Sequence, residues 1–147
     1  MDKQAVIIDS DIGYTKMGYG GNLDPDFVIP TAILDKKSTL GVSTNNDKYD
    51  YLIGEQAINQ AKISKKHKLT YPMKDGIIES WDLMEKYWHQ SIYGYLKCDT
   101  QEHDFVLTES PMNHPENREN IAEIFFETFN VPGLYIWVQS VFALLGC

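Results

Sequence analysis

Three residues near the start of the chain have types and a spacing that suit a phosphorylated ligand. Asp9 ends a short apolar segment, Gly13 lies in the turn that follows, and Lys16 stands two positions into the returning segment. The backbone N–H groups of a tight turn, with a lysine alongside, can hold a phosphate. A carboxylate at the end of a strand can orient water on a divalent cation. The pattern D-x-x-x-G-x-x-K is short, so a hairpin with an unrelated aspartate and lysine is the alternative interpretation.

A further candidate, Gln139, lies where the last expected strand gives way to a helix. A glutamine there can orient an attacking water, as in nucleotide hydrolases; the alternative is a hydrogen bond to the backbone at the helix start. Other chemistries lack their signatures, because the sequence contains no Walker loop, Rossmann fingerprint or G-x-S-x-G elbow. The histidines also lack metal-ligand spacing: His67, His89, His103 and His114.

Three short strands are expected to position the first candidates. An apolar run at 5–8, an alternating run at 14–19 and the run Phe27-Val28-Ile29 are separated by glycine-containing turns. This pattern predicts an antiparallel meander. Residues 35–50 are polar and predict a surface loop, which is followed by a strand at 51–54 and a helix from 55 to about 61.

The remainder alternates helices with strands. Ser80 fits an N-cap, and an apolar stripe predicts a core-facing helix from 81 to about 96. The members of this stripe are Trp81, Met84, Trp88, Ile92 and Tyr95. The later elements are a strand at 104–108, a helix from Pro115 to Pro132-Gly133, a strand at 134–138 and a helix from 139. A meander followed by strand–helix units predicts a mixed α/β layer.

Composition narrows the class of protein. The chain has 147 residues, of which 43% are hydrophobic and 23% charged, as in soluble single domains. Its net charge of −8 argues against nucleic acid and against an acidic membrane surface as partners. Cys98 and Cys147 form neither a disulfide framework nor a metal site, and no run suits a signal peptide or a membrane span. We therefore expect a cytoplasmic protein, with Cys98 as a structural thiol.

Six segments, in order along the chain, resemble the actin family. They are VIIDSDIGYTKMGYGGN (6–22), FVIPTAI (27–33), YLIGEQAI (51–58), YPMKDGIIESWDLMEKYWHQ (71–90), LTESPMNHPENRE (107–119) and FFETFNVPGLYIWVQ (125–139). Shorter motifs resemble the actin-related proteins more than conventional actin. These are GYTK-x-GY (13–19), WDLME (81–85), PENRE (115–119) and FNVPGLYI (129–136).

The resemblance implies an α/β, actin-like (ribonuclease H-like) mixed sheet with flanking helices and a small inserted subdomain. Residues 1–33 and 70–147 would form an incomplete subdomain 1, and residues 34–69 the inserted subdomain 2. The expected partners are actin and the other subunits of an actin-nucleating complex, at a cytoplasmic, cytoskeletal location. The expected function is therefore that of an assembly subunit rather than a metabolic enzyme.

The resemblance also implies ATP with Mg²⁺ in a cleft between two halves of the family fold. By position, Asp9 matches the aspartate that lies near the metal, through water, and Lys16 matches the lysine that reaches phosphate. Gly13 and Tyr14 match the phosphate loop, and Gln139 matches the glutamine that positions the hydrolytic water.

The chain departs from the family in that same loop. The family has a glycine followed by a hydroxyl residue where this sequence has Asp11 and Ile12. Asp11 would place a carboxylate beside the phosphates, and like charges about 4 Å apart repel by about 4 kcal/mol at an effective dielectric of about 20. Ile12 has no side-chain donor, and its β-branch resists unusual turn dihedrals. We therefore expect an impaired nucleotide site and no intact ATPase.

Other departures are smaller or lie at the end of the chain. Ser110, His114 and Trp137 replace residues usual in the family. The family's second phosphate loop, its adenine-binding half and its C-terminal helices lie beyond Cys147, so we expect half a nucleotide site and exposed apolar surface.

Two alternatives remain open. The first is a remnant or decoy fragment without nucleotide function that binds actin-complex subunits. The second is a small-molecule kinase of the same superfold, against which the run GIIESWDLME (76–85) argues.

Overall fold

A five-stranded mixed sheet forms the centre of the protein. The computed structural model describes residues 3–36 and 50–145, and its main sheet has the strand order β10-β9-β1-β2-β3. The strands are β1 (Val6–Ser10), β2 (Tyr14–Tyr19), β3 (Phe27–Pro30), β9 (Phe105–Glu109) and β10 (Leu134–Val138). β1, β2 and β3 pair antiparallel, whereas β9 pairs in parallel with both β1 and β10. The predicted meander and mixed α/β layer are confirmed.

β1 extends two residues beyond its expected end at residue 8. Asp9 and Ser10 pair with Lys16 and Thr15 of β2, so the ladder continues past the apolar run. Asp9 therefore lies within a strand instead of just after one. Its backbone is therefore paired with β2 at Lys16.

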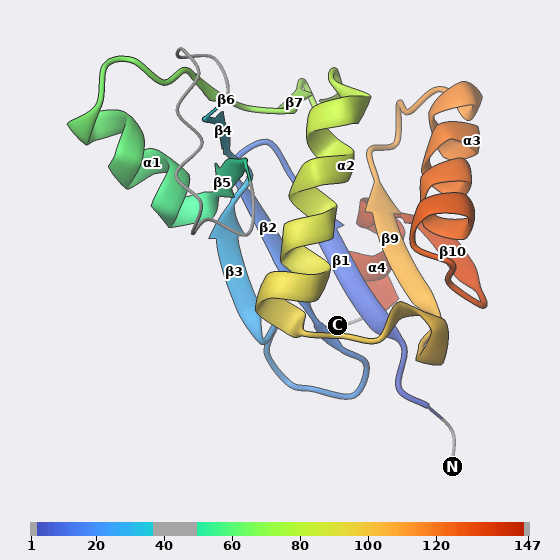
Figure 1. Cartoon of the computed structure of the whole chain (residues 1–147). Helices are drawn as coiled ribbons and strands as arrows, with labels where there is room; N and C mark the ends of the chain where they lie inside the picture. The colour runs from blue at the N-terminus through green and yellow to red at the C-terminus, as the bar shows by residue number, and fades with distance from the viewer. Residues whose placement is uncertain (1–2, 37–49, 146–147) are drawn as a thin grey trace.

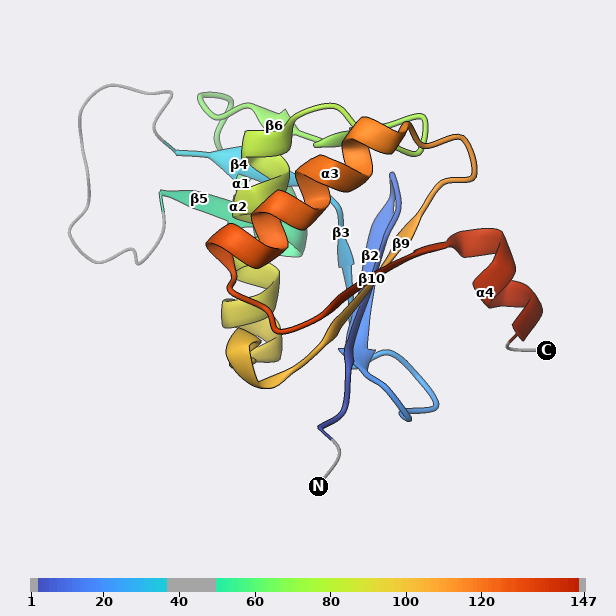
Figure 2. The ribbon, with the colours of Figure 1, turned by 90° about the vertical axis from the view of Figure 1, so that its right-hand side faces the viewer.

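Helices cover the two faces of the sheet unequally (Figures 1 and 2). α2 (Trp81–Gln90) and α3 (Pro115–Glu123) lie together on one face, whereas α4 (Gln139–Leu145) lies on the opposite side, near β10. None of the helices in the described part of the chain is long and apolar enough to cross a membrane.

The core lies between the sheet and the α2–α3 layer. Of the predicted stripe, Met84, Trp88 and Ile92 are fully buried, and Trp81 and Tyr95 pack against the core while partly exposed. Full burial of one large apolar side chain stabilises the folded state by about 1.5–3 kcal/mol. The stripe is therefore a core face, as predicted, and Cys98 is buried as expected.

The aromatic centre of this core joins the two helices to the sheet. Phe125 packs edge-on against Trp88 and against Phe129, each at 5.1 Å between ring centroids, and it meets Phe105 of β9 at 5.6 Å. Aromatic pairs of this kind add about 0.5–1.5 kcal/mol beyond their buried area.

Both core helices end in π-helical turns that the periodicity does not predict. α2 continues as η1 (Ser91–Leu96), and α3 continues as η3 (Ile124–Thr128). Lys97 and Asn130, which follow them, adopt left-handed conformations with φ of 51° and 53°. The second helical segment therefore ends before Asn130, short of the Pro132-Gly133 stop. Ser80 takes the expected N-cap position, although its side chain makes no capping hydrogen bond.

The insertion between β3 and α2 forms a small unit of its own. Its strands are β4 (Ile33–Asp35), β5 (Tyr51–Ile53) and β6 (Leu69–Thr70), in the order β5-β4-β6, and its helix is α1 (Gly54–Ile63). β5 and α1 match the prediction, whereas β4 and β6 were not expected. Most of the predicted 35–50 loop, residues 37–49, lies outside the described residues.

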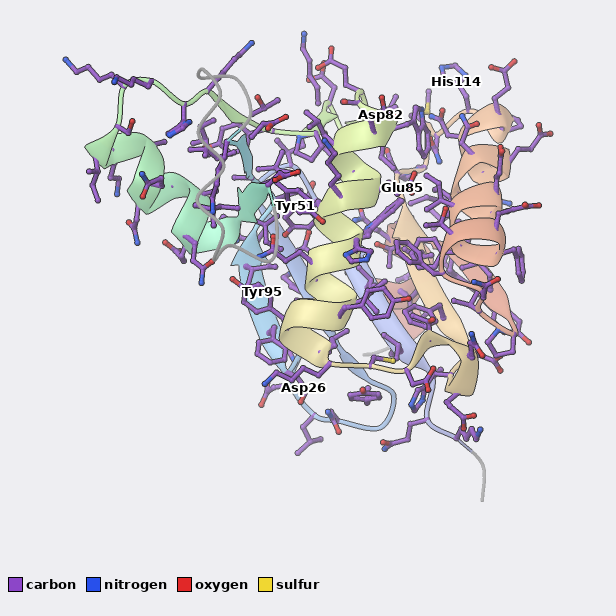
Figure 3. All side chains as sticks on the ribbon, in the orientation of Figure 1. Asp26, Tyr51, Asp82, Glu85, Tyr95 and His114 are labelled. Carbon is purple, nitrogen blue, oxygen red and sulfur yellow. The ribbon has the colours of Figure 1, made fainter. Side chains whose placement is uncertain are left out.

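Tyr51 and Gly54 are two of the residues through which the insertion contacts the body of the protein. Tyr51 lies between β5 and α2 (Figure 3), where its ring centroid is 5.9 Å from Lys86 Nζ. The backbone of Gly54 has a φ of +62° and lies close to Ile29 and to the Tyr95 hydroxyl. A bulkier residue at Gly54 would be strained there.

Three short elements after the insertion were not predicted. β7 (Met73–Lys74) and β8 (Ile77–Ile78) form a hairpin, and η2 (Thr100–Glu102) is a single 3₁₀ turn. The hairpin turns at Asp75 and Gly76, with φ of 53° and 77°. Two positive φ values in a two-residue loop match the type I′ hairpin that Asp-Gly favours.

Candidate functional site

Asp9 and Lys16 lie side by side on the sheet face opposite α2 and α3. The two residues are direct partners in the antiparallel β1–β2 register, so their side chains project from the same face. Their neighbours Ile8, Ser10 and Thr15 point to the other face and are buried. Asp9 is half-buried and Lys16 is exposed. The alternation of the strands alone therefore sets a carboxylate beside a lysine.

Gln139 reaches Asp9 from the far edge of the sheet. β1, β9 and β10 run in parallel, and the carboxyl ends of parallel strands meet at the same edge. Gln139 Nε2 donates to Asp9 Oδ1 at 2.8 Å. Thr108, at the end of β9 between them, donates its hydroxyl to the same oxygen. Two of the predicted site residues are thus joined, and Thr108 is an addition that the sequence did not single out.

The turn between β1 and β2 holds the departures from the family pattern. Asp11 N–H donates to the Tyr14 carbonyl at 3.1 Å, which closes the turn. Asp11 Oδ1 accepts from Ile12 N–H at 2.7 Å. The side chains of Ile12 and Tyr14 are 44% and 55% exposed. A carboxylate therefore already occupies one of the backbone donors of this turn.

Neither the backbone conformation of Gly13 nor its neighbours require a glycine at position 13. Its φ is not in the left-handed region, and a Cβ built there meets nothing within 4 Å. Its carbonyl accepts from Thr31 N–H at 3.0 Å, which ties the turn to the end of β3. The space beside Gly13 is open for a ligand to approach the backbone.

The residues present fit one part of a nucleotide and disfavour another. Asp9 has a carboxylate suited to water-mediated contact with Mg²⁺, and Lys16 supplies a cation for phosphate. Asp11 repels an anion and occupies the Ile12 amide. Within the described residues, no group of three or more His, Cys, Asp or Glu side chains is placed to hold a metal directly.

A second polar network braces the loop that follows Thr108. Glu109 points to the core face, and its side chain is 5% exposed. It accepts from Arg118 Nε at 2.8 Å, from Arg118 Nη2, and from Asn113 Nδ2 at 3.0 Å. The hydrogen bonds from Arg118 hold the pKa of Glu109 below its usual value. Sequence reasoning missed this pair, although Arg118 stands in the first turns of a helix just after the strand.

The face that carries Asp9 and Lys16 also has apolar surface. A hollow of about 260 Å³ lies beside them, lined by Ile7, Gly18, Tyr19, Leu23 and Pro25 among others. Farther along the sheet, Trp137 of β10 is 42% exposed and packs edge-on against Phe142 of α4, with ring centroids 5.7 Å apart. α4 is thereby attached to this face.

A mixed sheet with helices on both sides, and with polar side chains gathered at the carboxyl ends of its parallel strands, defines an α/β protein. A family model described as Actin matches residues 1–146. The chain belongs to the actin family. The resemblance read from the sequence is confirmed.

Relatives in that family are similar across nearly the whole chain. Actin-related protein 3 of Dictyostelium discoideum is 51% identical over 95% of this chain. Actin-related protein 3 of Caenorhabditis elegans is 48% identical over 95%, and that of Oryza sativa subsp. indica is 43% identical over 97%. The chain spans 34%, 35% and 37% of the length of these three relatives. The motifs at 81–85 and 115–119 had favoured this branch of the family.

Proposed function

We propose that this chain supplies one wall of an ATP–Mg²⁺ cleft of the actin type. The observation that carries the proposal is the convergence of Asp9, Lys16 and Gln139 at one edge of the sheet, with Gln139 bonded to Asp9 at 2.8 Å. In this assignment Asp9 holds metal-bound water, Lys16 pairs with phosphate, and Gln139 orients water. Gly13 and Tyr14 form the backbone of the phosphate turn.

Residues 1–33 and 70–147 would correspond to subdomain 1 of the family fold, and residues 34–69 to subdomain 2. The separate three-stranded unit formed by β4, β5 and β6 supports this division. Its helix α1 and its strands join the body through Tyr51 and Gly54.

The proposed cellular role is that of an actin-related protein 3-like assembly subunit. Its relatives carry that name, which points to the complex of actin-related proteins 2 and 3 that nucleates branched actin filaments. Its partners would be actin and the other subunits of that complex, in the cytoplasmic cytoskeleton.

The phosphate turn makes ATP binding by this chain weak. The Asp11 carboxylate accepts a hydrogen bond from the Ile12 amide, so this backbone donor is already engaged, and Ile12 has no hydroxyl. A second candidate function follows from the same contact: a chain without nucleotide function that binds subunits of the complex.

Affinity capture from cytosol tests the assembly role. The tagged chain is expected to recover actin or named subunits of the complex, identified by mass spectrometry. An unrelated acidic protein of similar net charge serves as the control. Recovery of neither actin nor any complex subunit would count against both candidate functions, whereas titration with MgATP separates them.

A further inference from the structure

Thr108 connects the two residues on which the proposed cleft depends. It lies in β9, between the strand that carries Asp9 and the strand that leads to Gln139. Its hydroxyl donates to Asp9 Oδ1, and Gln139 Nε2 lies 3.4 Å from the same hydroxyl oxygen. A hydroxyl has one proton and two lone pairs. With the proton given to the carboxylate, the Thr108 oxygen is left to accept from the amide.

The amide nitrogen of Gln139 therefore faces two acceptors. Asp9 Oδ1 lies at 2.8 Å and Thr108 Oγ1 at 3.4 Å, and a primary amide has two N–H bonds to direct at them. The orientation of a glutamine amide is assigned from such a network. A flipped amide would set Gln139 Oε1, which cannot donate, against the carboxylate. The network thus directs Oε1 away from Asp9.

The carboxylate of Asp9 is fixed in the same way. Both donors converge on Oδ1, which leaves Oδ2 as the oxygen that remains to receive hydrogen bonds from outside the triad. Asp9 is half-buried, so its side chain is held by the sheet on one side and meets solvent on the other. Charge-assisted hydrogen bonds to a carboxylate are the stronger kind.

We propose that Thr108 is a positioning residue that fixes both site side chains, so that Asp9 Oδ2 and Gln139 Oε1 are presented together as acceptors for water. Its role toward a nucleotide rests on the proposed function, whereas the network itself does not. Thr108→Val keeps the β-branched shape and removes both hydrogen bonds. Thr108→Ser keeps the hydroxyl.

The network is tested on the full chain without any nucleotide, by ¹⁵N NMR of side-chain amides. The Gln139 pair is identified by its absence in Gln139→Leu. Its hydrogens are expected to exchange with solvent more slowly than those of Gln56, which is exposed on α1. Thr108→Val should accelerate the exchange about tenfold, because the Gln139 amide loses its bond to Thr108 and Asp9 loses one of the two donors that hold it. Thr108→Ser should retain the parental rate.

A matched control is Thr128→Val, which removes an exposed hydroxyl at the end of η3 and should leave the Gln139 signals unchanged. Parental exchange in Thr108→Val would overturn the proposal, as would exchange in Thr108→Ser as fast as in Thr108→Val. If neither variant folds, the parental chain still tests the proposal. Side-chain amide exchange at Gln139 that is as fast as at Gln56 would overturn it. Because these measurements use no nucleotide, their outcome does not depend on whether the chain binds MgATP.

Discussion

Gln139 Nε2 lies 2.8 Å from Asp9 Oδ1, although 130 residues separate the two positions in the sequence. The contact forms because β9 places the ends of β1 and β10 on either side of Thr108. A strand near the start of the chain is thereby bonded to the helix near its end. The hydrogen bonds from Gln139 and Thr108 at the sheet edge both end on the Asp9 carboxylate.

Replacement of Asp9 tests the structural part of this relationship. Asp9→Ala leaves the Thr108 and Gln139 donors without their shared acceptor, so we expect a loss of about 1–3 kcal/mol in the free energy of unfolding. Asp9→Asn keeps an oxygen acceptor and should cost less. Urea denaturation measures both, and equal losses in the two variants would contradict the account.

Gly76 is expected to be essential to the β7–β8 hairpin. Its φ is +77°, and a Cβ there would lie 3.3 Å from Ser110 Oγ. Gly76→Ala should therefore cost about 1–2 kcal/mol, since an L side chain is strained in the left-handed region. Gly20→Ala, which is not left-handed and has only ordinary contacts, is the control. A matched loss in both variants would show that strain at Gly76 is not the cause.

The Glu109–Arg118 pair predicts a pH dependence of stability. The folded-state pKa of Glu109 is depressed below its usual 4.5. Its stabilisation is therefore complete above that value and is lost as the pH falls through the folded pKa. Glu109→Gln should be less stable than the parental chain at pH 7, by about 1.5–3 kcal/mol, and the gap should close in acid.

Denaturation curves between neutral pH and pH 3 measure this gap. Glu119→Gln, which neutralises an exposed carboxylate on α3, should show no comparable change. A gap for Glu109→Gln that stays constant with pH would contradict the assignment.

Trp137 is expected to hold α4 on the sheet. Its ring packs edge-on against Phe142 with centroids 5.7 Å apart. Trp137→Ala should speed amide hydrogen exchange in α4 by about twofold to tenfold, from the loss of one aromatic pair. Tyr135→Ala, on the same face of β10, should have a smaller effect. Unchanged α4 exchange in Trp137→Ala would mean that other contacts hold the helix.

The sequence predicted the elements that have strong local signals. The alternation at 14–19, the core stripe from Trp81 to Tyr95 and the proline at Pro115 each specify their structure within one segment. β4 and β6 are too short for a periodic signal, and they exist because each pairs with a distant segment. The sequence pattern also does not distinguish the π-helical turn η1 from an α-helix, because Ile92 is buried there as the α-helical stripe predicts.

The residues of the candidate site likewise divide into those that local sequence reveals and those that only the tertiary structure brings together. Asp9, Gly13 and Lys16 stand out because a strand, a turn and a strand are close in sequence. Thr108 carries no motif, and its part depends on β9 lying between β1 and β10. The Asp11 contact with the Ile12 amide is a side-chain conformation that no residue pattern specifies.

We expect Asp11 and Ile12 to weaken nucleotide binding at the turn between β1 and β2. MgATP titration of the parental chain and of Asp11→Gly/Ile12→Ser, followed by calorimetry and by NMR shifts of the Gly13 and Lys16 amides, tests it most directly. We expect parental affinity no tighter than about millimolar and a gain of about tenfold in the double variant, since one like-charge contact is worth about 1 kcal/mol in water and more when partly buried. Micromolar binding by the parental chain, or equal affinities, would contradict the claim.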